Sequence, residues 1–106
     1  MRLGPLEQRV LDALWSRGSE ARVRDLQPSF PEIAYTTLMT TLDRLHRKGL
    51  LERMMDGRAF AYRPRLTRAE TVLSYLVEEV GSLDADALDA LSRLISERRR
   101  ALENGK

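Results

Sequence analysis

The chain has 106 residues and a mass of 12.2 kDa, which suits one compact domain with a modest extension and excludes two large domains. It contains no cysteine and one histidine, which excludes a disulfide framework and thiolate metal sites and argues against histidine-dependent catalysis. No apolar run approaches the roughly 18 residues that cross a bilayer, and charges interrupt the first apolar stretch. We therefore expect a cytoplasmic protein with no signal peptide, membrane insertion, metal or cofactor.

Basic residues are concentrated in the first part of the chain. Residues 1–66 carry a net charge of +4, and residues 67–106 carry −2. The excess is sharpest within 44–65, where seven basic residues are accompanied only by Glu52 and Asp56. Clustered cations of this kind suit a polyanion such as nucleic acid, although a solvated charged face has the same composition.

Two helices are predicted before residue 31. Apolar residues at helical spacing predict a first helix over 5–17, with Pro5 in its first turn and Gly18 as a left-handed cap. A second apolar set is spaced for one face of a short helix. It comprises Val23, Leu26 and Phe30. Because Pro28 removes a backbone hydrogen bond, we expect this second helix to be short or distorted.

The segment 34–48 has a clear amphipathic pattern and predicts a third helix that ends at Gly49. Its apolar side is expected to comprise Ala34, Leu38, Leu42 and Leu45. Its polar side comprises Thr36, Thr40, Asp43, Arg44 and Arg47, with Thr37, Thr41 and Lys48 on one flank.

A β-hairpin is predicted immediately after this helix. The stretch LLERMMDGRAFAYRP reads as two strands around Asp56-Gly57, a strong hairpin signal, and Pro64 closes the second strand. Phe60 and Tyr62 are expected to share one strand face. Three short helices followed by a hairpin describe a winged helix-turn-helix domain over residues 1–66, so the predicted fold is mainly α with a small β-hairpin.

Residues 67–106 predict two further amphipathic helices, separated at Gly81-Ser82, with Ser82 or Asp84 as the cap of the second. So small a piece cannot bury its apolar faces alone. It either docks on the first domain or pairs with a second copy, and we predict pairing because helices that read DNA commonly work as symmetric pairs. The predicted dimerisation residues are Leu73, Leu76, Val77, Leu88, Leu91, Leu94 and Ile95.

The third helix is the candidate DNA-reading element, because the second helix of a helix-turn-helix motif enters the major groove. The candidate contacts are Tyr35, Thr36, Thr37, Thr40, Arg44, Lys48 and Arg58. Threonine can bond a base edge or a phosphate and touch a thymine methyl with its own methyl group, while Tyr35 can reach a phosphate. Arg58 lies at the tip of the predicted wing. Each contact also has a competing interpretation. The threonines can be incidental residues of a solvent-exposed face, Arg58 can simply increase solubility, and Lys48 can interact favourably with the helix dipole.

No catalytic site is predicted. Carboxylates occur together at Glu78-Glu79 and at Asp84 and Asp86, but no partner base, glycine-rich loop or metal-ligand spacing accompanies them. His46 falls toward the apolar side of the third helix and is expected to pack there. We therefore predict that the protein is not an enzyme.

A resemblance to a known family rests on four stretches of the sequence. They are LGPLEQRVLDALWSRG, AYTTLMTTLDRLHRKGLLER, DGRAFAYRP and LTRAE. Together they resemble the penicillinase-repressor family over about residues 3–70. The resemblance implies a winged-helix transcriptional repressor that binds an inverted-repeat operator as a homodimer held by its C-terminal helices. By position, Thr36, Thr37, Thr40 and Arg44 resemble the recognition-helix contacts, and Arg58 resembles the wing contact.

The chain departs from the family pattern after the wing. The resemblance offers a membrane sensor-protease as a partner, but residues 67–106 contain no counterpart of the segment that such a protease cuts. The C-terminal cysteines of the copper-responsive branch are also missing. The alternative function is a winged-helix protein-interaction module that does not bind DNA.

Overall fold

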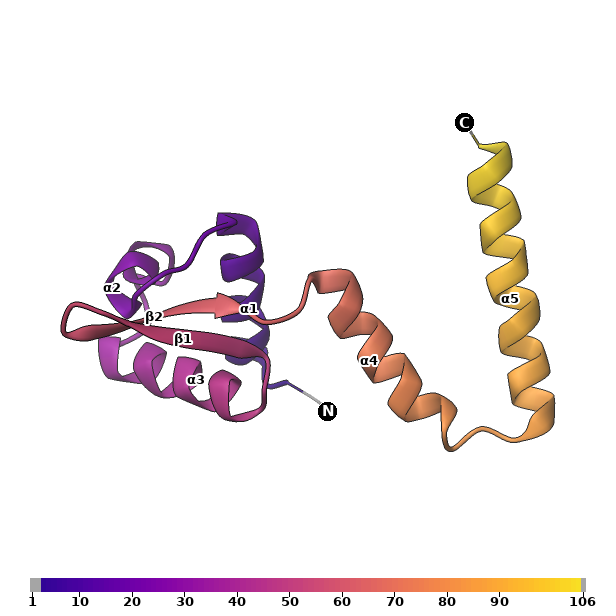
Figure 1. Ribbon diagram of the computed structural model, residues 1–106, viewed down its shortest axis with the longest axis horizontal. Coiled ribbons are helices and arrows are strands. Elements are labelled where there is room, and N and C mark those ends of the chain that lie inside the picture. The colour runs from indigo at the N-terminus through magenta and orange to yellow at the C-terminus, as the bar shows by residue number, and fades with distance from the viewer. Residues whose placement is uncertain (1–2, 106) are drawn as a thin grey trace. The chain divides into compact units, whose positions relative to one another are not determined.

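The computed structural model describes residues 3–105. This part of the chain contains, in order, α1 (Pro5–Arg17), α2 (Val23–Leu26), a 3₁₀ turn η1 (Gln27–Ser29), α3 (Tyr35–Arg47), β1 (Leu51–Asp56), β2 (Ala59–Pro64), α4 (Arg68–Val80) and α5 (Ala85–Asn104). It divides into two compact units, one up to Thr71 and one from Val72 onward. The division falls within α4 (Figure 1), whose first turn belongs to the first unit.

The first two helices form as the sequence predicts. Helix α1 begins at Pro5, and Gly18 takes a left-handed conformation at its end, with φ of 71°. Helix α2 is a single turn, and Pro28 lies in the 3₁₀ turn that follows it. Because proline has no N–H to donate, it cannot continue the α-helical bonding pattern, so the prediction of a shortened helix is confirmed.

Helix α3 occupies the predicted segment and buries Leu38, Leu42 and Leu45 completely. Two details of its predicted faces are wrong. Ala34 is exposed because it is the N-cap, with an extended backbone that precedes the helical face. Thr41, predicted on a polar flank, is only 4% exposed. Its hydroxyl can be buried because it donates to the Thr37 carbonyl oxygen at 2.7 Å, which satisfies the polar group inside the fold.

The two strands form the predicted antiparallel hairpin, with Asp56 paired to Ala59. The turn itself is Gly57-Arg58, so the expected Asp56-Gly57 turn is shifted by one residue. Gly57 has φ of 69°, and within residues 3–105 no other residue type has a positive φ. This is the pattern of a type II′ turn, which needs glycine only at its first central position. Arg58 is therefore presented at the tip of the hairpin.

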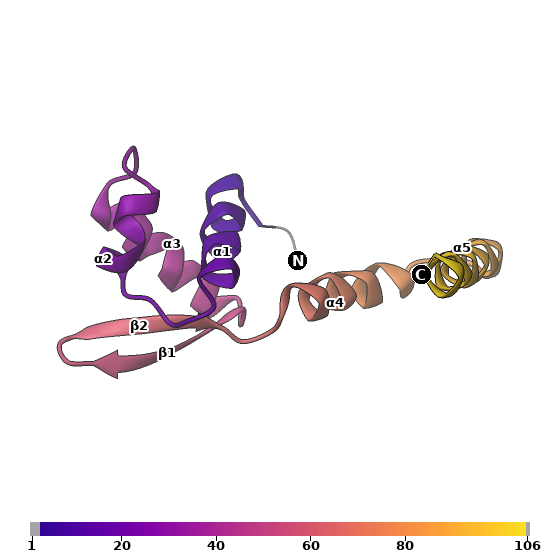
Figure 2. The same ribbon diagram turned by 90° about the horizontal axis from the view of Figure 1, so that it is seen from above.

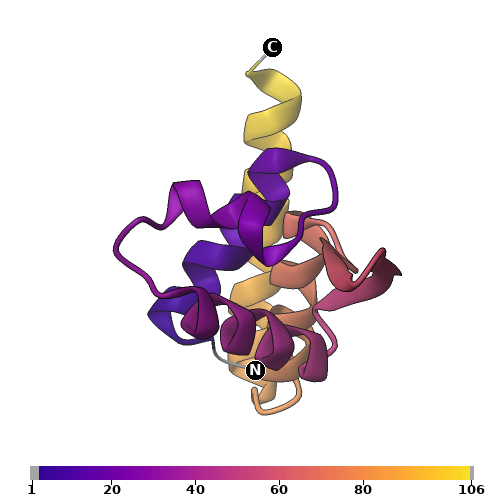
Figure 3. The same ribbon diagram turned by 90° about the vertical axis from the view of Figure 1, so that its left-hand side faces the viewer.

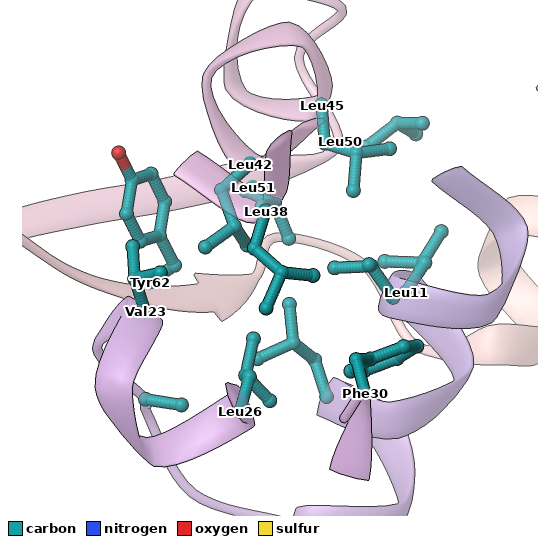
Figure 4. Close-up of a cluster of buried hydrophobic side chains, with 13 residues drawn as sticks. Leu11, Val23, Leu26, Phe30, Leu38, Leu42, Leu45, Leu50, Leu51 and Tyr62 are labelled. Carbon is teal, nitrogen blue, oxygen red and sulfur yellow. The ribbon is translucent and has the colours of Figure 1, made fainter. Parts of the chain in front are cut away.

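The first unit has one hydrophobic core, enclosed by α1, α2, α3 and one side of the hairpin (Figures 2 and 4). Leucines of α1 and α3 meet Val23, Leu26 and Phe30 there, and Tyr62 of β2 closes the core beside the wing. A backbone bridge between Ala21 and Tyr62 attaches the segment before α2 to the hairpin. Helix α3 runs along the outside of this core with the hairpin beside it (Figure 3). The winged helix-turn-helix prediction is confirmed.

Side-chain caps fix where the last two helices start. At α4, the Thr67 hydroxyl accepts from the Glu70 N–H at 3.1 Å, and the Glu70 carboxylate accepts from the Thr67 N–H at 3.0 Å. This reciprocal pair is a capping box, and the hydrogen bond that the Thr67 N–H donates to the carboxylate is the main cause that holds the Glu70 pKa below its ordinary value. At α5, Asp84 accepts from the Ala87 N–H at 2.9 Å, so Asp84 rather than Ser82 is the cap.

The second unit exposes the apolar stripes of its helices. Of the seven predicted dimerisation residues, Leu91 is partly buried and the other six are exposed. Val72 and Leu102 extend the same exposed apolar surface. Solvent exposure of so many aliphatic side chains is unfavourable. That a second copy of the chain covers these faces stays a prediction.

Candidate nucleic-acid interface

Helix α3 presents a polar surface on the side opposite its buried leucines. The predicted contacts Thr36, Thr37, Thr40 and Arg44 are exposed on or beside this surface, and Tyr35 is exposed at the start of the helix, on the side of the wing. The surface follows from helical periodicity, because residues 36, 40, 43 and 47 lie about half a turn from Leu38, Leu42 and Leu45. The structure therefore brings these five predicted residues together on one accessible helix.

The hydroxyl of Thr40 is already used as a donor. Its Oγ1 donates to the Thr36 carbonyl oxygen at 2.9 Å. A hydroxyl has one donor proton and two acceptor lone pairs, so in this rotamer Thr40 offers a ligand only acceptor capacity and a methyl group. A phosphate oxygen is itself an acceptor, so it cannot form a hydrogen bond with Thr40 in this rotamer. A base amino group can donate to the Thr40 hydroxyl oxygen, and a thymine methyl can contact the Thr40 methyl group.

Most of the basic residues between 44 and 65 have internal partners. Arg47 pairs with Asp43, Arg63 pairs with Glu52, and the Arg65 Nε donates to the Gly49 carbonyl oxygen at 2.6 Å. Within the described residues, the guanidinium groups of Arg44 and Arg58 alone in this stretch have neither an ion pair nor a hydrogen bond. One of these free cations lies on α3 and the other at the tip of the wing.

Two ion pairs connect the wing to the helices. Arg53 of β1 lies 3.3 Å from the Asp43 carboxylate of α3, and its guanidinium also stacks 4.2 Å from the centre of the Phe60 ring. At the end of β1, Asp56 lies 2.7 Å from Arg22, the residue before α2. The first contact joins the hairpin to α3, and the second joins it to the segment that precedes α2.

Lys48 is placed differently from the other predicted contacts. Its ammonium lies 2.9 Å and 2.8 Å from the two carboxylate oxygens of Glu7 in α1. The Glu7 side chain is largely buried, and the Lys48 side chain is half-buried. Burial acts to raise the Glu7 pKa, but hydrogen bonds from Lys48 and from the Gly4 N–H outweigh it and hold the pKa below its ordinary value. Lys48 therefore has an internal partner 41 residues away.

Two clefts flank the outer face of α3. One, of about 490 Å³, lies between α3 and the start of α1 and is lined by Thr36, Thr37, Thr40 and Arg44. The other, of about 200 Å³, lies between α3 and the wing and is lined by residues that include Tyr35, Met39, Arg58 and Phe60. The predicted contacts thus line both sides of the helix.

Met39 is the residue of this surface that the sequence analysis missed. It is 45% exposed and lies on the side of α3 that faces the wing, four residues after Tyr35. Its position at i+4 from Tyr35 and i+3 from Thr36 in the amphipathic pattern is the signal that could have identified it.

Residues 3–105 contain no cluster of three or more His, Cys, Asp or Glu side chains placed to hold a metal ion. His46 is partly buried, in keeping with the prediction that it packs. Among the described helices, none is sufficiently long and apolar to span a bilayer.

Comparison with known proteins assigns the family. Residues 3–100 match the family described as penicillinase repressor. The chain belongs to the penicillinase repressor family. It is 37% identical to the transcriptional regulator BlaI of Mycobacterium tuberculosis, in strains CDC 1551 and H37Rv, over an alignment 116 positions long that covers 91% of this chain and 84% of the relative.

A solved structure supports the fold of this repressor-family chain. A MarR family protein from Bacillus stearothermophilus superposes with a TM-score of 0.55 at 19% sequence identity, covering 98% of this chain and 78% of the other. At that identity the likeness concerns the fold only. It agrees with the winged-helix arrangement of the first unit.

Proposed function

We propose that this penicillinase repressor family member is a sequence-specific DNA-binding transcriptional repressor that acts as a homodimer on an inverted-repeat operator. The observation that carries the proposal is the pair of free guanidinium groups, Arg44 on α3 and Arg58 at the wing tip. They flank an exposed threonine surface on the helix that a winged helix-turn-helix domain inserts into the major groove. The relatives in M. tuberculosis are named as transcriptional regulators, and we expect no catalytic activity.

The residues divide by chemistry into two roles. Arg58 and Tyr35 are assigned to phosphates, because the wing and the start of α3 lie at the edges of the surface and phosphate contacts position a protein without reading sequence. Arg44, Thr36, Thr37 and Thr40 are assigned to base edges, where arginine pairs with guanine and threonine meets either a polar edge or a thymine methyl.

Lys48, at the end of α3, is assigned to a phosphate of the DNA backbone. That phosphate must compete with the Glu7 carboxylate for the Lys48 ammonium. An ammonium has three donors, and its carboxylate partner leaves it partly exposed. A phosphate that approaches this end of the helix can therefore share Lys48 with Glu7, at the cost of placing two anions near one cation.

The second unit is proposed to form the dimer. The exposed stripe, which contains Leu73, Leu76 and Val77 on α4 and Leu88, Leu91, Leu94 and Ile95 on α5, suits a symmetric interface in which each copy covers the other. A two-fold dimer places two copies of α3 about one helical turn of DNA apart, or a multiple of it, so the operator is expected to be an inverted repeat. A membrane sensor-protease is not part of this proposal.

Selection from random double-stranded DNA tests the proposal directly. The full chain is expected to enrich an inverted repeat, and its affinity for the enriched site should fall steeply with salt, by a log–log slope of about −0.9 for each neutralised phosphate. Arg44→Ala should weaken binding by about 1–3 kcal/mol if the arginine reads a guanine. Arg93→Ala, an exposed arginine on α5, is the matched control and should leave affinity unchanged.

Two results would contradict the proposal. If no sequence is enriched and the chain is not retained on DNA at low salt, the winged helix is a protein-interaction module instead. If a site is enriched but Arg44→Ala binds it as tightly as the original chain, Arg44 does not belong to the interface.

A further inference from the structure

An exposed apolar side chain lies in the middle of the proposed reading surface. Met39 projects from α3 between Tyr35 and Asp43, and almost half of its side chain is open to solvent. It lines two clefts, the one that it shares with Arg58 and a second, of about 310 Å³, that it shares with Thr40 and Arg53. Met39 therefore occupies the corner between α3 and the wing.

Thr40 makes the corner beside Met39 more apolar than the presence of a threonine hydroxyl suggests. Because the Thr40 hydroxyl donates to the Thr36 carbonyl oxygen, Thr40 presents its methyl group and acceptor lone pairs to the outside. Asp43, the next residue along the helix face, is held by Arg47 and Arg53. The corner thus combines a thioether and a methyl group with charges that are already paired.

One group in the major groove has the complementary chemistry. Phosphates and the edges of guanine, cytosine and adenine present hydrogen-bond donors and acceptors there, whereas thymine also presents its C5-methyl group. An unbranched, polarisable methionine side chain adapts readily to such a group. Contact between the two removes apolar surface of both partners from water.

We propose that Met39, supported by the methyl group of Thr40, reads a thymine methyl in each operator half-site and is thereby a specificity-determining residue. This inference rests on the proposed function, since it requires that α3 enters the major groove. It assigns to the wing side of α3 a recognition chemistry different from that of Arg44, which lies on the side facing α1.

The test replaces thymine with deoxyuridine, which removes the C5-methyl group and leaves every hydrogen-bonding group unchanged. Each thymine of the selected operator half-site is replaced in turn, and the affinity of the full chain is measured. At one position, we expect the original chain to lose roughly fourfold in affinity, which corresponds to one buried methyl-sized group. Met39→Ala should lose a similar factor on the thymine operator and show no further loss on the deoxyuridine operator.

Two variants serve as controls. Met39→Leu retains a large apolar side chain and should keep most of the sensitivity to the thymine methyl. Met55→Ala removes an exposed methionine from the hairpin and should respond to deoxyuridine as the original chain does. Urea unfolding of Met39→Ala should match the original chain, because the side chain is largely outside the core.

The outcomes separate this inference from the proposed function. If the original chain enriches no DNA, the proposed function fails and this inference fails with it. If the chain binds its operator with a steep salt dependence but Met39→Ala and the original chain lose the same factor at every deoxyuridine, Met39 reads no methyl group, and the proposed function stands.

Discussion

The Glu7–Lys48 ion pair joins the start of α1 to the end of α3 and gives a quantitative test of the structure. The perturbation is Lys48→Met, which keeps the length and apolar character of the stem and removes the ammonium. The Glu7 side chain is 13% exposed to solvent, and the Lys48 side chain is 32% exposed. This burial places the pair between a solvated surface pair, worth up to about 1 kcal/mol, and a buried pair, whose disruption costs about 3–5 kcal/mol.

The expected magnitude follows from these limits. Lys48→Met leaves a largely buried carboxylate with only the Gly4 N–H as hydrogen-bond donor, so we expect a loss of about 2 kcal/mol in the free energy of unfolding of the first unit. Glu7→Gln and the double variant complete a thermodynamic cycle. Urea unfolding is followed by the fluorescence of Trp15, the single tryptophan of the chain, whose Nε1 donates to the Leu66 carbonyl oxygen at 3.0 Å in the folded unit.

The pair also predicts a pH dependence. The Glu7 pKa is lower in the folded protein than its ordinary value of 4.5, so ionised Glu7 stabilises the fold above that value. The contribution is lost as the pH falls through the lowered pKa. The stability difference between the original chain and Lys48→Met should therefore be full at pH 7 and shrink in acid. A coupling energy near zero at pH 7, or equal to that of the exposed Arg63–Glu52 pair measured in the same way, would refute this account of the Glu7–Lys48 pair.

Three further predictions concern DNA binding, the dimer and the core. Glu7→Gln frees the Lys48 ammonium from its ion pair. If Lys48 contacts a phosphate, operator affinity at low salt should rise, and the log–log dependence of affinity on salt should steepen by up to about one unit. An unchanged binding isotherm would show that Lys48 does not belong to the interface. Ile95→Asp places a charge in the exposed stripe of α5 and should convert the proposed dimer to monomer in sedimentation, with loss of cooperative operator binding. An intact dimer in this variant would contradict the assignment. Leu42→Ala empties a completely buried site in the core and should cost about 2–5 kcal/mol in urea unfolding, whereas a cost below 1 kcal/mol would show that this site is not packed as described.

The sequence by itself determined the elements of the winged helix. Helix boundaries depend on local backbone chemistry, so Pro5 and Gly18 marked the ends of α1, and Pro28 marked the interruption of α2. The helical spacing of the leucines within residues 38–45 identified the buried side of α3, and the remaining positions then defined its exposed side. Such patterns are readable because they depend on residues three or four positions apart.

The tertiary structure decided which groups of the candidate site are available to a ligand. The sequence contains seven basic residues between 44 and 65. Only the fold shows that Arg44 and Arg58 form no ion pair or hydrogen bond among the described residues, because pairing also depends on residues distant in the chain. The fold likewise brought Lys48 to Glu7 and placed Met39 beside the wing. Periodicity fixes the direction of a side chain relative to its own helix, whereas the packing of separate elements determines what that side chain meets.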